Sequence, residues 1–463
     1  MKQSYAEIYE DIYGDVNADY KQIRILLDEI SSGCVLEIGA GSGRLIDLYI
    51  GYPHLNFYLI EPSKEMQKLL NKKLAESNLE NIHVFNDLSF CLPFELGTFD
   101  LVLFPFAGIT EMSPLIFTIS EAHRVLKDRG VIYFNAMNPL KSSSLAVGIA
   151  RSKMSKSKKS LSAENFPVPT KGNFFYEVHC EYRYPGFSEK FIIEQVHPDV
   201  VLWELMLKGV GFNNFKITGN FDNESFDKNN SIILKIEATK DKSAIVESLN
   251  GKMAEVVYDA MSSTYEEIAR GENYFAPLWI KKKLEAYQNL HPICLDLGCA
   301  TGTIGDLLSD LNIQPAFLFG SDISEKMIEQ CRRKSIYSSV AQWDLSCGFP
   351  EPKFLQFDLI FAIGVLEFVE NIDVLLKDIH HLLKIGGETL LTFESDECEN
   401  KVTEFMLPQG IFKRFSYNIE NLKDMFARNN LSIVEIYHSK GYISPRTGST
   451  VNYWYCQLKK IKL

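Results

Sequence analysis

The chain has 463 residues and a formal charge of −12 at pH 7, with 46% hydrophobic and 23% charged residues. This composition is ordinary for folded globular protein and excludes the disordered and fibrous classes. No uninterrupted apolar run approaches the roughly 20 residues that cross a bilayer, and the acidic N-terminus lacks a signal-peptide pattern. The length suggests about three domains, and we expect a cytoplasmic protein without membrane contact.

The cysteines and the charge narrow the class further. The nine cysteines are odd in number and scattered through apolar stretches, which is typical of small core residues rather than of a disulfide framework. Neither a CxxC pair nor an HExxH motif occurs, so no metal site is expected. An acidic chain repels phosphate backbones on average, so we expect no nucleic-acid partner.

The first 140 residues alternate short apolar segments with amphipathic ones. A helix is predicted over Lys64–Glu76, because Met66, Leu70 and Leu74 fall on one face. Strands buried on both faces of a parallel sheet are predicted at residues 34–38, 57–60, 101–104 and 131–135. The alternation indicates an α/β, doubly wound fold.

The chain after the fifth predicted strand is less regular. The first half is predicted to carry about 38 extra residues, because a late helix near residues 202–211 recurs too early in the second half. The extra residues are expected to include an insertion at about residues 141–172. Within the insertion, Arg151–Ser160 is basic and aperiodic, as in a mobile surface loop. The aromatic run at residues 174–184 is predicted to form a strand. A linker is expected at residues 241–254.

The second half repeats the first. Cys34–Gly43 is matched by Ile293–Gly302, and four further landmarks follow in the same order at offsets of 257 to 261 residues. The matching landmarks are Glu61–Met66 with Asp322–Met327, Asp87–Ser89 with Asp344–Ser346, Phe99–Val102 with Phe357–Ile360, and Gly130 with Gly387. Such a long period indicates two whole domains, at residues 1–240 and 255–463.

A glycine-rich turn follows the first predicted strand of each half. In the first half Gly39, Gly41 and Gly43 stand at positions i, i+2 and i+4, ahead of a helix whose N-terminal N–H groups are unpaired. Position i+5 is Arg44 in one half and Thr303 in the other, so the dinucleotide motif GxGxxG is absent from both. The turns are therefore built for close approach of a different ligand.

Acidic residues accompany each turn. Glu61 and Asp322 end the second predicted strands, where a carboxylate can accept two hydrogen bonds from a ribose diol. The ordered set in each half is an acid before the glycines, the glycine turn, the acid ending strand two, and Asp-Leu after strand three. This set, found twice, resembles the class I S-adenosylmethionine-dependent methyltransferases over residues 5–240 and 255–463. The resemblance implies two Rossmann-like domains that bind S-adenosylmethionine and release S-adenosylhomocysteine.

The resemblance also implies roles for individual residues. The acids of the first strands would lie near the methionine amino group, the turns beneath the methionyl and ribose part, and the Asp-Leu aspartates near the adenine amino group. Tyrosines in the N-terminal segments would close over the sites. The implied residues are Tyr13, Glu37, Gly39, Ala40, Gly41, Gly43, Glu61, Pro62, Asp87, Leu88 and Phe104 in the first half. In the second half they are Tyr265, Asp296, Gly298, Cys299, Ala300, Gly302, Asp322, Ile323, Asp344, Leu345 and Ala362.

Two departures from the family pattern stand out. Ala300 replaces the middle glycine of the second turn, where the added methyl either crowds the cofactor or is tolerated. In the first half, Asp128-Arg129-Gly130 replaces the usual proline-glycine-glycine before strand five. Neither change disables a cofactor site by itself.

Methyl transfer needs two well-placed reactants, and a general base only when the acceptor loses a proton. Glu111 and Glu367, in matching loops after strand four, are the candidate catalytic residues. The alternative is that each is solvated or caps the next helix. His123 and the pair His380-His381 fall on predicted helices, where packing or surface roles are expected.

Three functions remain open from the sequence. The first is methyl transfer to a small-molecule acceptor with a cofactor site in each domain. The second is one catalytic domain joined to a degenerate binding or dimerisation domain. The third is methylation of an RNA or protein acceptor recruited through the basic segment. A homodimer is compatible with all three.

Overall fold

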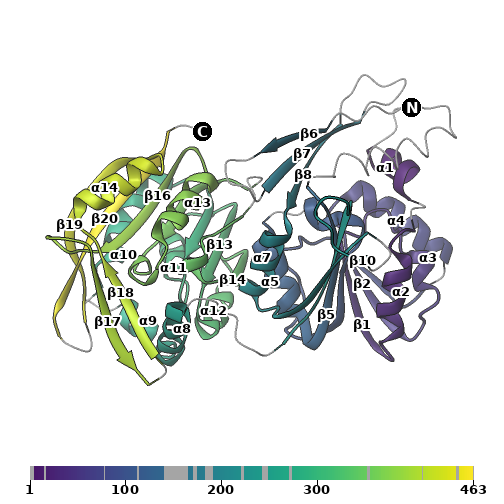
Figure 1. Cartoon of the computed structure of the whole chain (residues 1–463), viewed down its shortest axis with the longest axis horizontal. Helices are drawn as coiled ribbons and strands as arrows, with labels where there is room; N and C mark the ends of the chain where they lie inside the picture. Colours follow the sequence, from purple (N-terminus) through teal and green to yellow (C-terminus); the bar gives the residue numbers. More distant parts are fainter. Residues whose placement is uncertain are drawn as a thin grey trace. The chain divides into compact units, whose positions relative to one another are not determined.

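The computed structural model (Figure 1) describes residues 5–14, 17–77, 79–111, 114–139, 165–169, 175–182, 191–220, 224–241, 249–270, 274–351, 355–408, 410–444 and 448–461. The chain divides into two compact units, Met1–Ile245 and Val246–Leu463. Each unit has its own central sheet and its own core. The basic segment Arg151–Ser160 lies outside the described residues.

The first unit contains an eight-stranded sheet with the order β10-β9-β11-β5-β4-β1-β2-β3. Its strands are β1 (Gly33–Ile38), β2 (Leu55–Ile60), β3 (Ile82–Phe85), β4 (Phe99–Phe104), β5 (Leu126–Met137), β9 (Asn214–Gly219), β10 (Glu224–Ser225) and β11 (Ile233–Thr239). The first five are parallel, and β11 runs antiparallel between β5 and β9. Val35, Leu36 and Val102 are fully buried, because helices cover both faces.

The helices of the first unit follow the predicted alternation. They are α1 (Tyr5–Tyr13), α2 (Tyr20–Asp28), α3 (Ile46–Tyr49), α4 (Lys64–Ser77), the 3-10 helix η1 (Pro105–Glu111), α5 (Leu115–Val125) and α7 (Val200–Val210). In α4 the buried residues are Met66 and Leu70, on the face that the periodicity marks as apolar. The doubly wound fold class is confirmed.

A small antiparallel sheet stands between β5 and α7. Its strands are β6 (Asn165–Pro169), β7 (Phe175–Tyr182) and β8 (Phe191–Pro198), in the order β6-β7-β8. The connection that contains it, residues 138–199, is longer than its counterpart in the second unit, residues 395–418. Of the predicted insertion at 141–172, only Asn165–Pro169 falls within the described residues.

The second unit contains a seven-stranded sheet with the order β14-β13-β12-β15-β16-β20-β19. Its strands are β12 (Ile293–Leu297), β13 (Phe317–Asp322), β14 (Ser339–Gln342), β15 (Phe357–Ala362), β16 (Leu383–Glu394), β19 (Leu431–Ile443) and β20 (Thr450–Lys460). A separate hairpin is formed by β17 (Lys401–Leu407) and β18 (Gly410–Ser416). Strand β20 is antiparallel to both of its neighbours, as β11 is in the first unit.

The helices of this unit begin earlier than the sequence suggests. They are α8 (Leu249–Met261), α9 (Tyr265–Arg270), α10 (Ala276–Leu284), η2 (Glu285–Tyr287), α11 (Thr303–Asp310), α12 (Glu325–Arg332), η3 (Leu345–Cys347), η4 (Leu366–Phe368), α13 (Ile372–Leu382) and α14 (Ile419–Arg428). Helix α8 starts inside the stretch 241–254 that we expected to be linker, because Met253 and Ala254 are buried against Phe412 of the hairpin.

The strand order locates the ligand site in each unit. The order reverses between β1 and β4 in the first sheet and between β12 and β15 in the second. In open α/β sheets, ligands bind outside the carboxyl ends of the strands at such a switch point. Both glycine turns begin there, immediately after Ile38 and Leu297.

The described residues contain neither a membrane-spanning helix nor a metal-binding cluster. No helix among them has the length and apolar character needed to cross a membrane. They also contain no group of three or more His, Cys, Asp or Glu side chains arranged to hold a metal ion.

Candidate cofactor sites

In the first unit the glycine turn is tied to the acid that follows β2. The N–H of Gly41 donates to Oε2 of Glu61 at 2.8 Å, and the N–H of Ser63 donates to Oε1 at 2.8 Å. Glu61 is 7% exposed, and burial raises the pKa of its carboxyl although both N–H groups favour the charged form. The side chain is therefore fixed at the switch point by backbone donors.

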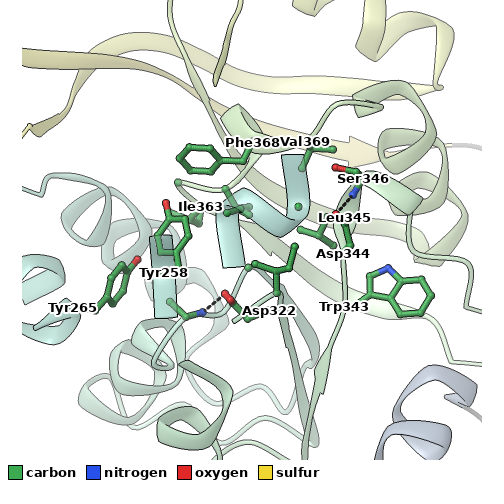
Figure 2. A pocket seen from close by; sticks show the side chains of 17 residues that line it. Tyr258, Tyr265, Asp322, Trp343, Asp344, Leu345, Ser346, Ile363, Phe368 and Val369 are labelled. Carbon is green, nitrogen blue, oxygen red and sulfur yellow. Dashed lines mark hydrogen bonds between the residues drawn. The ribbon is translucent and has the colours of Figure 1, made fainter. Parts of the chain in front are cut away.

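The second unit repeats this arrangement with a shorter acid. The N–H of Ala300 donates to Oδ2 of Asp322 at 2.9 Å (Figure 2). The N–H of Ser324 donates to Oδ1, also at 2.9 Å. Burial raises the pKa of Asp322 to about 6. The two units thus build the same bond pattern from different acids.

The backbone of the turns explains which glycines are required. Gly41 and Ala300 share the left-handed conformation, with φ of 56° and 47°. A Cβ at Gly41 would have no atom within 4 Å, which is why an alanine is accommodated at the matching position. By contrast, a Cβ at Gly298 would lie 2.6 Å from the side chain of Val365. The first glycine is fixed by packing, whereas the middle one is constrained by conformation alone.

The acids that precede the turns are buried and bonded to tyrosines. Glu37 and Asp296 are each 2% exposed. Tyr49 donates to Oε2 of Glu37 at 2.7 Å, and Tyr337 donates to Oδ2 of Asp296 at 2.6 Å. Burial raises the pKa of each carboxyl to about 7, more than the hydroxyl lowers it. In either unit, a cationic group placed beside this carboxyl would stabilise its charged form.

A pocket opens over the second turn (Figure 2). Its walls come from α8, α9, the turn, the ends of β13 and β14, and the segment after β15. The predicted residues that line it are Tyr265, Gly298, Ala300, Asp322, Ile323, Asp344 and Leu345. The residues that the sequence did not single out are Gly251, Ala254, Tyr258, Trp343, Ser346, Ile363, Gly364, Val365, Phe368 and Val369.

Most of the pocket-lining residues that the sequence did not single out could not have been found by comparing the two halves. Helix α8 precedes the repeated segment, so no comparison of the halves marks Tyr258. Trp343 and Ser346 adjoin the predicted pair Asp344-Leu345 and could have been included with it. Asp344 accepts a hydrogen bond from the N–H of Ser346 at 2.9 Å and faces the pocket.

Several predicted residues of the second unit do not line this pocket. Asp296 lies behind the turn on Tyr337. Cys299 is 4% exposed and Ala362 is fully buried, so both side chains belong to the core. Gly302 has φ of 92° and precedes α11 as its N-cap residue. These residues shape the turn and its strands.

The predicted residues of the first unit are spread over the same edge of its sheet. Gly39 and Gly43 have φ of 78° and 80°, and Ala40 is buried between them. Tyr13 is 6% exposed, with its ring centroid 5.6 Å from that of Phe106. The remaining members differ in exposure: Phe104 is buried, Asp87 is half-buried, and Pro62 and Leu88 are exposed.

The structure describes the side chain of only one of the two candidate catalytic residues. Glu111 ends η1, and its side chain lies outside the described part of the chain. Glu367 is 2% exposed and accepts a hydrogen bond from Tyr453 at 2.7 Å. The alternative of a solvated or helix-capping side chain is therefore wrong for Glu367. His123 packs edge to face on Phe212, in agreement with its expected packing role.

Comparison with known families identifies the two halves. Family models described as methyltransferase domain match residues 35–130 and 295–389, one in each unit. The chain is a tandem pair of class I methyltransferase domains. The cofactor of this tandem methyltransferase is S-adenosylmethionine.

Each similar protein covers only part of this chain, and the curated relative is itself covered only in part. The sterol 4-C-methyltransferase strm-1 of Caenorhabditis elegans is 27% identical over 154 residues, which are 29% of this chain and 45% of that protein. The chain thus matches less than half the length of this curated relative. The PH0226 protein of Pyrococcus horikoshii OT3 is 17% identical, with 51% of this chain and 100% of that chain covered and a TM-score of 0.39. A methyltransferase structure from Clostridium acetobutylicum is 16% identical, with 51% and 98% covered and a TM-score of 0.37.

The residues of the second site fit this cofactor. Asp322 is held by two backbone donors at the pocket wall, where its oxygens can accept from a ribose diol. Asp344 follows the next strand along the sheet, beside apolar Ile323 and Val369. The carboxyl of Asp296 lies behind the turn on Tyr337 and is not part of the pocket lining. The first unit offers Glu61, Asp87 and Glu37 at the corresponding positions.

Proposed function

We propose that the tandem methyltransferase transfers methyl groups from S-adenosylmethionine to a small-molecule acceptor, with a cofactor site in each unit. The observation that carries the proposal is the duplicated bond between turn and acid, from Gly41 to Glu61 and from Ala300 to Asp322. The same pairing in both units is what binding of the same ligand at this point would require. The acid itself has changed between them, yet its two backbone donors have not.

Roles for the chain's own residues follow from this geometry. Glu61 and Asp322 would bind the ribose hydroxyls, and Asp87 and Asp344 the adenine amino group. The family resemblance assigns Glu37 and Asp296 to the amino group of the methionyl part, and each is held beside its turn by a tyrosine hydroxyl. When bound, the cofactor supplies an electrophilic methyl group on a sulfonium. The protein's contribution is to place an acceptor in line with that methyl and to exclude water.

The elements that surround the second pocket favour a small-molecule acceptor. Asn250 of α8 is 3% exposed and donates to the carbonyls of Phe368 and Lys413 at 2.9 and 3.2 Å. Its side-chain oxygen accepts from the N–H of Lys413 at 2.7 Å. Helix α8, η4 and the β17–β18 hairpin are thereby bonded together beside the pocket. A pocket braced in this way suits a small molecule better than an RNA or a folded protein, and strm-1 is by its name a sterol methyltransferase.

Calorimetric titration with S-adenosylhomocysteine tests the proposal. We expect two equivalents per chain for the natural protein, one for Glu61→Ala, one for Asp322→Ala and none for the double variant. Asp310→Ala, which removes an exposed carboxylate of α11, should retain two. No binding to the natural protein would overturn the proposal. One equivalent, lost in only one of the single variants, would favour one working domain and one degenerate binding or dimerisation domain.

A further inference from the structure

An acidic cluster of five side chains lies beside the second pocket: Glu367, Glu394, Arg414, Tyr442 and Tyr453. The guanidinium of Arg414 donates to Glu394 and, at 2.6 Å, to the hydroxyl of Tyr442. Tyr453 donates to Oε1 of Glu367 at 2.7 Å. The other oxygen of Glu367, Oε2, is buried and has no hydrogen-bond partner among the described residues.

The charges of this cluster do not balance. Arg414 is the cation that acts on both Glu367 and Glu394, so one guanidinium serves the buried carboxyl of Glu367 and the half-buried carboxyl of Glu394. Burial and, to a lesser degree, the charge of Glu367 raise the pKa of Glu394 to about 7, although Arg414 lowers it. A buried carboxylate oxygen without a partner is costly. A second cation at Oε2 of Glu367 would complete the cluster.

The cluster borders the pocket through two residues of the segment after β15. Gly364 lines the pocket, and a Cβ built on it would lie 3.0 Å from the hydroxyl of Tyr274 and 3.6 Å from that of Tyr453. Phe368 also lines the pocket, and its ring centroid is 5.8 Å from Cζ of Arg414. Glu367 lies between these two residues in the chain.

Aromatic rings form the wall at this end of the pocket. The ring of Tyr258 lies 5.7 Å from that of Phe368 and 6.3 Å from that of Tyr265, in edge-to-face arrangements. Figure 2 shows these three rings on the opposite side of the pocket from Trp343. Aromatic faces combined with a carboxylate are the groups that recognise ammonium ions. The adenosine-facing acids Asp322 and Asp344 belong to other strands of the sheet.

We propose that the acceptor of the second unit is a small-molecule amine, with its nitrogen held between these rings and Glu367. The inference rests on the proposed function and names its acceptor class. An ammonium loses a proton to the Glu367 carboxylate, and the freed nitrogen lone pair then attacks the methyl carbon. The N–C bond forms as the C–S bond breaks, with the C–S electron pair passing to sulfur. The proton on Glu367 is released to water.

Other acceptor classes fit the same atoms poorly. An anionic acceptor would be repelled by Glu367 and Glu394, which outnumber Arg414. An uncharged, mainly apolar acceptor would leave the buried Oε2 of Glu367 without a partner. Only a cationic acceptor both neutralises the cluster and satisfies that oxygen.

The test uses the full chain and tetramethylammonium, a permanent cation that cannot itself be methylated. Binding is followed by saturation-transfer NMR in the presence of S-adenosylhomocysteine, with tert-butanol as an uncharged probe of similar shape. We expect tetramethylammonium to bind saturably, and about tenfold more weakly to Glu367→Gln, a loss of about 1.4 kcal/mol. S-adenosylhomocysteine affinity should change less than about threefold in this variant. Asp378→Asn, which alters a half-buried carboxyl outside the cluster, should leave tetramethylammonium binding unchanged.

Three results would overturn the inference: no tetramethylammonium binding, equal binding of tert-butanol, or undiminished binding to Glu367→Gln. The comparison of the two probes on the natural protein needs no variant, so it decides the matter even if Glu367→Gln fails to fold. Absence of S-adenosylhomocysteine binding would instead contradict the proposed function. That failure is distinguishable, because the two probes can also be compared without the cofactor product.

Discussion

The two glycine turns allow a quantitative comparison of three substitutions. Ala300→Gly removes a methyl from a residue with φ of 47°, and Gly41→Ala adds one at φ of 56°. A left-handed alanine costs about 1–2 kcal/mol in the folded state. Replacing glycine by alanine recovers about 0.4–1 kcal/mol from the unfolded chain. We therefore expect Ala300→Gly to stabilise its unit by about 0.5–1 kcal/mol, and Gly41→Ala to destabilise its unit by a similar amount.

Gly298→Ala adds a steric cost to the conformational one. Its φ is 75°, and the new methyl would lie 2.6 Å from Val365. Overpacking of this kind costs about 1–3 kcal/mol more. The expected loss is therefore about 2–4 kcal/mol, clearly larger than for Gly41→Ala.

Urea unfolding followed by tryptophan fluorescence provides the measurement. The first unit contains Trp203, and the second contains Trp279, Trp343 and Trp454, so transitions can be assigned to units through single-tryptophan variants. A destabilised Ala300→Gly would refute the reasoning from conformation. A Gly298→Ala variant no less stable than Gly41→Ala would refute the reasoning from the Val365 contact.

Three further predictions concern stability, pH and the cover of the site. Asp19→Ala should destabilise the first unit by about 3–5 kcal/mol in the same urea assay, because it leaves buried Arg44 without its two 2.7 Å hydrogen bonds; a loss below about 1 kcal/mol would show that the pair is dispensable. Asp296→Asn should gain stability over the natural protein by about 1.4 kcal/mol per pH unit from about pH 4 to 7 and then level off. The sign follows because a folded-state pKa raised to about 7 makes the natural protein lose stability as pH rises to that value; a pH-independent difference would contradict it. Asn250→Ala should accelerate amide hydrogen exchange in α8, with about 1–3 kcal/mol less protection, since three hydrogen bonds to η4 and β18 are lost; unchanged exchange would mean that packing alone holds the helix.

The glycine turn and the acid bonded to it were predictable in each unit, because their residue types stand at set spacings. Close approach to backbone demands glycines, and a ribose diol demands an acid at the end of the next strand, so both leave residue types at set spacings. Those spacings occur twice, which is why the duplication and the fold class could be inferred without coordinates. In the structure, Glu61 and Asp322 each accept a hydrogen bond from a backbone N–H of their turn, at 2.8 and 2.9 Å.

The length that suggested three domains is explained by two copies of one fold. The sequence by itself determined this duplication, because the spacing of residues along a strand, its turn and the next strand is a local property. The tertiary structure decided how the buried acids are bonded. Glu37 is bonded by Tyr49 of α3, whereas Asp296 is bonded by Tyr337, which follows α12. A hydroxyl can reach the same point from either element, so no repeat in the sequence marks it. Burial likewise decided that Glu367 is a partly unpaired carboxyl, because its surroundings come from strands distant in the chain.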